Sequence, residues 1–97
     1  MGDRIEMAKE YEKRTNIYEP VAVMTWFTAE GVMMPKLIKY EDKSGTRHTV
    51  DNIDAKIISE NQTTTVVYKC KAMDYEFIKE FRLIFFVKDH KWKICFQ

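Results

Sequence analysis

The sequence contains few of the residues that punctuate, cross-link or strongly charge a chain. Its 97 residues include only three glycines, two prolines and two cysteines, and its formal net charge is +1. Scattered glycines cannot form a glycine-rich phosphate loop, and a charge so close to balance disfavours a general polyanion binder. No apolar run approaches the roughly 18 residues that span a bilayer, and no cationic leader precedes an apolar stretch. We therefore expect a cytoplasmic protein that contacts no membrane and keeps its thiols reduced.

Aromatic and aliphatic side chains are abundant instead. Hydrophobic residues make up 45% of the chain and charged residues 32%, as in soluble globular domains. The six Phe, five Tyr and two Trp supply most of the apolar area, because each aromatic side chain can bury roughly 150–250 Å². A chain of this length forms one domain, residues 1–97, whose core needs neither a metal nor a disulfide.

Apolar and polar residues alternate with a period of two through the last third of the chain. The apolar positions of the three runs are Val66, Tyr68 and Cys70; Phe81, Leu83, Phe85 and Val87; and Trp92, Ile94 and Phe96. This period places successive side chains on opposite faces of an extended backbone, so the runs predict consecutive β-strands. Cys95 falls on the face opposite Trp92, whereas Cys70 shares the buried face, which favours two structural thiols over a disulfide.

The first two thirds of the chain predict a helix and further strands. The expected elements are a helix over residues 4–14 and strands over residues 21–28, 33–41 and 47–59, the last with a β-bulge near Asp51-Asn52. Gly31 and Gly45 mark turns. We expect a mainly all-β fold over residues 20–97, either a small antiparallel six-stranded barrel or a strongly curved sheet, with a short N-terminal helix within residues 1–16. An open sheet crossed by that helix is the alternative.

Several short motifs follow one another in a fixed order between residues 21 and 97. They are Phe27 and Gly31 with Pro35, a turn at Gly45, Val50-Asp51-Asn52-Ile53, Tyr68-Lys69-Cys70, Ile84-Phe85-Phe86 and a final strand with Trp92. In this order they resemble a family of short, uncharacterised bacterial β-rich proteins. The chain departs from the family in lacking an aromatic residue before Asp51, in its Glu41-Asp42-Lys43 turn and in its N-terminal extension. The resemblance implies one small β domain in a bacterial cytosol and brings no activity with it.

The sequence does not predict a metal site. Such a site needs three or four convergent nitrogen, oxygen or sulfur ligands. The available residues are His48, His90, Cys70 and Cys95, and no two of them have ligand spacing. We expect two solvated histidines and no bound metal or other cofactor.

The sequence does not predict a catalytic site either. Neither Ser44 nor Ser59 is flanked by a glycine elbow, and a Cys–His pair would need a coincidence of the fold. Asp51 and Asp54 are the best carboxylate pair, but three-residue spacing on a strand places them on opposite faces. Asp51 is more easily interpreted as a support for the bulge or turn. We predict that the protein is not an enzyme.

An apolar group on outward positions is the first candidate for binding. It consists of Met24, Trp26, Ile84 and Phe86. A strand that is apolar on both faces is usually covered on both, and either the expected N-terminal helix or a partner chain could cover this one. These residues therefore predict a protein-interaction surface, with homodimerisation as the default.

A basic group is the second candidate. It consists of Lys69, Lys71, Arg82, Lys91 and Lys93, which frame the aromatic ring of Phe86. Small barrels bind single-stranded nucleic acid with such a surface, by phosphate pairing and base stacking. Lysines that keep a sheet soluble give the same pattern, and we favour that interpretation. The sequence thus predicts a non-enzymatic protein-interaction module, with single-stranded nucleic-acid binding as the alternative.

Overall fold

The computed structural model describes residues 18–61 and 63–96, and these form seven β-strands and no helix. The strands are β1 (Glu19–Phe27), β2 (Met33–Glu41), β3 (Arg47–Val50), β4 (Asp54–Asn61), β5 (Thr65–Asp74), β6 (Phe77–Phe86) and β7 (Lys91–Phe96). The predicted all-β class is therefore confirmed for this part of the chain. The helix expected at residues 4–14 lies outside the described residues.

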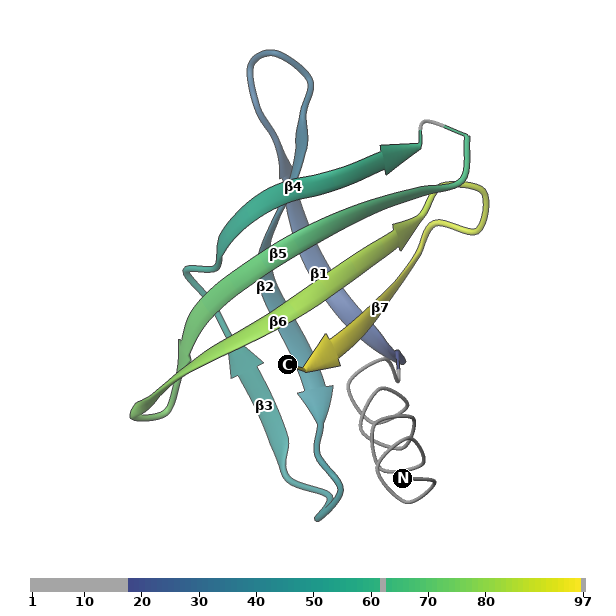
Figure 1. The fold of residues 1–97 in the computed structure, drawn as a ribbon. Helices are drawn as coiled ribbons and strands as arrows, with labels where there is room; N and C mark the ends of the chain where they lie inside the picture. Colours follow the sequence, from purple (N-terminus) through teal and green to yellow (C-terminus); the bar gives the residue numbers. More distant parts are fainter. Residues whose placement is uncertain (1–17, 62, 97) are drawn as a thin grey trace, which may run out of the picture.

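All strands belong to one antiparallel sheet with the order β3-β2-β1-β7-β6-β5-β4 (Figure 1). Two meanders, β1–β3 and β4–β7, are joined where β1 pairs with β7. Among the described strands, β3 and β4 have one hydrogen-bonded neighbour each and do not pair with each other. The sheet is consequently open between β3 and β4, and the expected closed barrel is wrong.

The single strand expected over residues 47–59 is two strands at opposite edges of the sheet. β3 ends at Val50, and β4 begins at Asp54. Val50 and Ile53 are both buried, one beside each edge. The phase change in the apolar pattern therefore marks a crossing between edges rather than a β-bulge. Asn52, in the connection between the two strands, has a φ of 51°.

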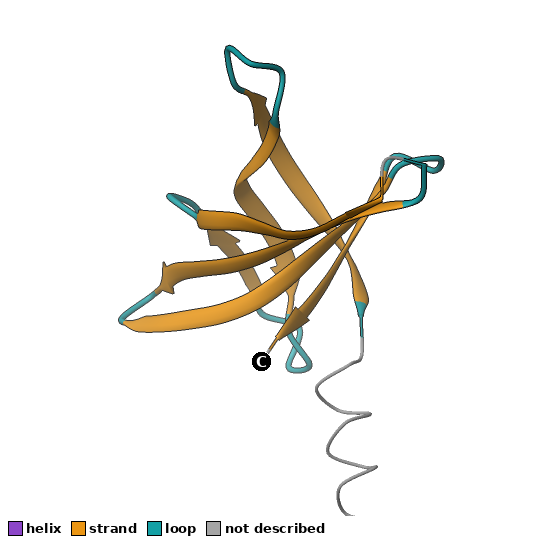
Figure 2. Cartoon of the chain, turned by 45° about the horizontal axis from the view of Figure 1, so that its top comes forward, coloured by secondary structure: helices purple, strands orange, loops and turns teal. Residues whose placement is uncertain are grey.

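The sheet bends so that β3 lies opposite β5 and β2 lies opposite β4 (Figures 1 and 2). We call the side enclosed by this bend the inner face and the other side the outer face. The buried apolar side chains of the inner face are Ile38, Val50, Ile53, Tyr68, Cys70, Ala72, Phe81, Leu83, Trp92 and Ile94. Across the bend, the Tyr68 hydroxyl donates to the Met33 carbonyl oxygen at 2.6 Å.

Turns and bulges fall where backbone geometry requires them. Gly31 and Gly45 both have a φ of 85°, a region that costs glycine little and other residues more. Pro35, which cannot donate a ladder hydrogen bond, lies where the β1–β2 register shifts between Met24 and Thr25. The turns predicted at these glycines and the special position predicted for Pro35 are confirmed.

Candidate functional site

A polar cluster begins in the turn between β2 and β3. One carboxylate oxygen of Asp42 accepts hydrogen bonds from the Ser44 hydroxyl at 2.6 Å and from the Ser44 and Thr46 amides at 2.9 and 3.0 Å. The other accepts a hydrogen bond from His48 Nε2 at 2.8 Å. The Ser44 hydroxyl, followed by His48, lowers the pKa of Asp42 well below its ordinary value. Asp42 is therefore held ionised.

His48 lies at the centre of this cluster. It is buried on the inner face of β3, and its Nδ1 lies 3.1–3.2 Å from the two oxygens of Asp74 at the end of β5. Its ring stacks on Tyr40, directly opposite in β2, with 4.6 Å between the ring centroids. Asp42 and, to a lesser extent, Asp74 raise the pKa of His48. A protonated imidazole donates from both nitrogens and so satisfies both carboxylates.

Two further groups complete the cluster around Asp74. The Tyr40 hydroxyl donates to the Asp74 carboxylate at 2.6 Å. Lys79, from β6, lies 3.0 Å from the same carboxylate oxygen and 3.1 Å from the Tyr40 oxygen. Burial alone would raise the pKa of Asp74, but hydrogen bonds from Tyr40, Lys79 and His48 lower it overall. With His48 and Lys79 protonated, the two positive charges balance the two carboxylates.

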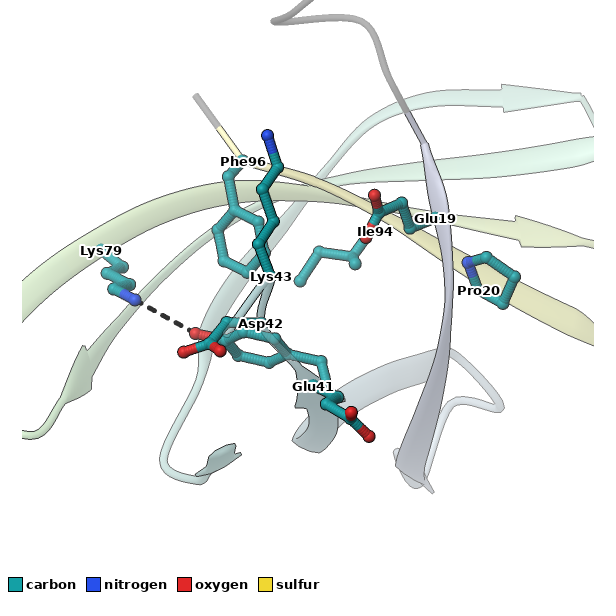
Figure 3. Close-up of a pocket in the computed structure, with 9 residues that line it drawn as sticks. Glu19, Pro20, Glu41, Asp42, Lys43, Lys79, Ile94 and Phe96 are labelled. Atoms are coloured by element: carbon teal, nitrogen blue, oxygen red, sulfur yellow. Dashed lines mark hydrogen bonds between the residues drawn. The ribbon is translucent and has the colours of Figure 1, made fainter. Parts of the chain in front are cut away.

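A cavity of about 350 Å³ opens beside this polar cluster (Figure 3). Tyr40, Phe96 and Ile94 form its apolar wall, and Lys79 lies over the rings of Tyr40 and Phe96 at 5.8 and 5.6 Å from their centroids. The charged groups of the polar cluster bind one another rather than projecting unpaired into this space. The arrangement is well suited to holding β2 and β3 against β5 and β6.

The second cavity is an apolar groove of about 550 Å³ at the other end of the inner face. It opens where β1 and β7 separate, because β1 pairs with β7 only at Glu19–Val21. The lining residues are Thr25, Phe27, Gly31, Val32, Met33, Ile57, Glu60, Val66, Tyr68, Phe85, Val87, His90 and Trp92. Aromatic rings line its floor, with Phe85 and Trp92 in contact at 5.0 Å between centroids.

Beside this groove, β1 has an unpaired edge. From Ala22 to Phe27 it pairs with β2 on one side, and no described strand lies along the other. Trp26 is 63% exposed and Phe27 is 70% exposed. We call this segment the free edge of β1. Exposed apolar edges of this kind can accept a further strand from another chain.

The structure separates the apolar residues that the sequence analysis grouped. Met24 and Trp26 are exposed on the outer face of β1, near the β1–β2 turn. Ile84 and Phe86 are half-buried on the outer face of β6. Between these strands lies β7, whose outer face carries lysines, so the two pairs do not form one patch.

The predicted basic residues do share one face. Lys69 lies directly opposite Arg82, and Lys93 and Lys91 lie opposite Ile84 and Phe86. Directly opposite residues of an antiparallel pair point to the same side of the sheet. Lys71, however, lies between Asp54 and Glu80 on the neighbouring strands.

The expectation of two solvated histidines is wrong for His48 and correct for His90, which is exposed. His48 directly follows an exposed turn, but the alternation His48–Val50 places it on the inner face. Cys70 and Cys95 are buried thiols, as expected. Burial raises the pKa of the Cys70 thiol to about 12, which keeps it protonated. Asp51 and Asp54 are exposed.

The polar cluster was not predicted from the sequence, although one local signal for it exists. Tyr40 and His48 are equidistant from the Ser44 turn, as expected for cross-strand partners in a hairpin. Asp74 and Lys79 come from the β5–β6 hairpin, 26 and 31 positions beyond His48. The spacing of residues along the sequence does not predict that side chains so far apart in the chain come into contact.

Comparison with protein-family models, curated proteins and solved structures found no significant match. The resemblance to short bacterial β-rich proteins therefore stays a prediction. Within residues 18–61 and 63–96, no group of three or more His, Cys, Asp or Glu side chains could hold a metal ion. In the same part of the chain, no helix is long and apolar enough to span a membrane.

Proposed function

We propose that the protein is a non-enzymatic protein-interaction module whose docking site is the free edge of β1 and whose default partner is a second copy of the chain. The observation that carries this proposal is the coincidence of an unpaired strand edge, exposed aromatic residues and an adjoining apolar groove. An added strand would gain main-chain hydrogen bonds from β1. Its inward side chains would cover Phe85 and Trp92 in the groove.

The sequence of β1 is suited to pairing with itself. No charged residue lies between Val21 and Thr28. In an antiparallel arrangement centred on Thr25, Met24 of one copy faces Trp26 of the other, and Val23 faces Phe27. Sulfur–aromatic and aliphatic–aromatic contacts then replace water on both faces. A two-fold axis makes the same contacts twice.

The exposed area predicts a weak, reversible dimer. The exposed parts of Trp26 and Phe27, together with Met24, which is 52% exposed, would bury on the order of 300 Å² on each copy. A standard stable interface buries about 1,200–2,000 Å² in total. We therefore expect a dissociation constant in the micromolar range.

The polar cluster supports the non-enzymatic part of the proposal. His48 uses one ring nitrogen for Asp42 and the other for Asp74. A general base needs a free lone pair within reach of a substrate. Both ring nitrogens of His48 are engaged by carboxylates, so its contacts are those of a structural bridge between strands.

Sedimentation equilibrium of the full chain over a wide range of concentrations tests the proposal. We expect the average mass to rise with concentration for the wild type and to stay monomeric for Trp26→Glu. Ile78→Glu is the matched control, because Ile78 is 64% exposed on the opposite end of the sheet, and it should associate as the wild type does. A wild type that is monomeric at high micromolar concentration would contradict the proposal.

A charge swap tests the arrangement of the two copies. Thr25 faces its own copy across the proposed axis, so Thr25→Glu alone and Thr25→Lys alone place like charges opposite each other and should abolish association. Mixing the two variants should restore it as a heterodimer. Equal association of the single variants and the mixture would exclude pairing centred on Thr25.

A further inference from the structure

The outer face of β4–β7 carries a row of cations that crosses the strands. Lys56 of β4 lies directly opposite Lys69 of β5, and Lys69 lies directly opposite Arg82 of β6. Lys56 and Lys69 are exposed, and Arg82 is half-buried. Because neighbouring strands are about 4.8 Å apart, the row brings these positive charges within about 10 Å of one another. Lys56 was not among the predicted basic residues.

Lysines of β7 continue this surface around an aromatic ring. Lys93 Nζ lies 5.5 Å from the centroid of the Phe86 ring, and Lys91 is directly opposite Phe86. Within the described part of the chain, none of these cations forms an ion pair with a carboxylate. We call Lys56, Lys69, Arg82, Lys91, Lys93 and Phe86 the basic face.

Two carboxylates on this side of the sheet lie in the adjacent row. Asp54 and Glu80 are the two residues directly opposite Lys71. Lys71 is thus compensated on both sides, whereas the basic face is not. A chain with a net charge of only +1 therefore concentrates uncompensated positive charge on one surface.

We infer that the basic face binds single-stranded nucleic acid, with phosphates on the cations and a base on the Phe86 ring. A cross-strand row of cations complements a polyanion with closely spaced charges. A half-exposed aromatic ring among lysines can stack an unpaired base, which a duplex does not offer. This site is separate from the free edge of β1, so either surface can bind without the other.

The number of uncompensated cations sets the expected salt dependence. If about five phosphates are neutralised, log K should fall with log salt concentration with a slope of about −3.5 for a single strand. Between about 50 mM and about 200 mM salt, affinity should then fall roughly 100-fold. A contact with a single fixed charge would give a much shallower dependence.

Fluorescence anisotropy of the full chain with labelled homopolymeric DNA and RNA single strands tests the inference. Lys56→Glu and Lys69→Glu should each weaken binding strongly and make the salt slope shallower. Lys71→Glu is the matched control, because it lies on the same face one row away and is already flanked by carboxylates, and it should weaken binding less than Lys56→Glu or Lys69→Glu does. Phe86→Leu, checked for an unchanged thermal transition, should lose about fivefold in affinity through lost stacking.

Several outcomes would overturn the inference. These are no binding at low salt, a salt-independent affinity, an equal loss for Lys71→Glu and Lys69→Glu, and equally tight binding to vesicles of anionic lipid or to duplex DNA. Trp26→Glu separates this site from the proposed self-association surface, since it should leave oligonucleotide binding unchanged.

Discussion

At the scale of single residues, His48 joins parts of the sheet that do not pair as strands. It lies on β3, and its two nitrogens contact Asp42 in the β2–β3 turn and Asp74 at the end of β5. The sheet is open between β3 and β4, so backbone hydrogen bonds do not hold β3 against β5. The polar cluster supplies a connection there, and its strength depends on the charge of His48.

This charge predicts a pH dependence of stability. Folding raises the pKa of His48 above its ordinary value of 6.5. The stabilisation is therefore fully present below pH 6.5 and is lost as pH rises through the pKa of the folded state. Urea unfolding at a series of pH values should show the free energy of unfolding falling from mildly acidic to alkaline pH.

The matched variants are His48→Gln and His90→Gln. The first should remove this dependence above pH 6.5, and the second, in the exposed β6–β7 turn, should keep it. Asp42 and Asp74 act in the opposite direction, because their lowered pKa values give stability that is lost as pH falls below about 4. If the free energy of unfolding of His48→Gln changed with pH above 6.5 as it does in the wild type, the charge of His48 would not be the source of this dependence.

At the scale of secondary structure, the local pattern predicted most strands but not how the strands are arranged. The second strand, residues 33–41, was predicted with its observed bounds, because Gly31 and Gly45 punctuate it on both sides. β5 extends to Asp74, and Tyr75-Glu76 alone makes the turn into β6. Polar Asp74 resembles a turn residue, yet it is buried against His48.

The main wrong prediction at this scale was a single bulged strand over residues 47–59, where the chain instead crosses from β3 to β4. The apolar spacing of Val50 and Ile53 fits either a bulge or a change of edge, and only the pairing of distant strands distinguishes the two. The pairing of β1 with β7 was hidden for the same reason, since it joins the first strand to the last.

The crossing itself makes a testable prediction at Asn52. Its φ of 51° lies in the left-handed region, which asparagine and glycine tolerate and β-branched residues do not. Asn52→Val should lower the free energy of unfolding by about 1–2 kcal/mol, and Asn52→Gly should change it little. Urea denaturation of both variants measures the difference. Equal stability of the two would mean that the chain does not need a left-handed residue at this crossing.

At the scale of the whole molecule, the inner face of the sheet holds most of the buried apolar side chains among the described residues. The inner face buries Leu83, Tyr68 and Phe81 almost completely. Alternation predicted most of the buried positions, because a period of two decides which side chains share a face. It failed at the end of β7, where Cys95 is 2% exposed and Phe96 is 37% exposed. The bend that turns this face inward, and the separation of β1 from β7 that opens the groove, are not encoded in any single run.

Core packing predicts a large difference between inner and outer substitutions. Leu83 is 0% exposed, and Leu83→Ala should lower the free energy of unfolding by about 2–5 kcal/mol. Ile58→Ala, at a position that is 44% exposed on β4, should cost less than about 1 kcal/mol. Similar losses for the two variants, measured by thermal and urea unfolding, would contradict the assignment of the inner face.

Amide hydrogen exchange at increasing protein concentration tests the central claim, that the free edge of β1 docks a second copy. We expect protection of the amides of Val23–Phe27 to rise with concentration, while the amides of β5 and β6 keep the same protection throughout. Exchange in Val23–Phe27 that is identical in dilute and concentrated protein would contradict docking at this edge.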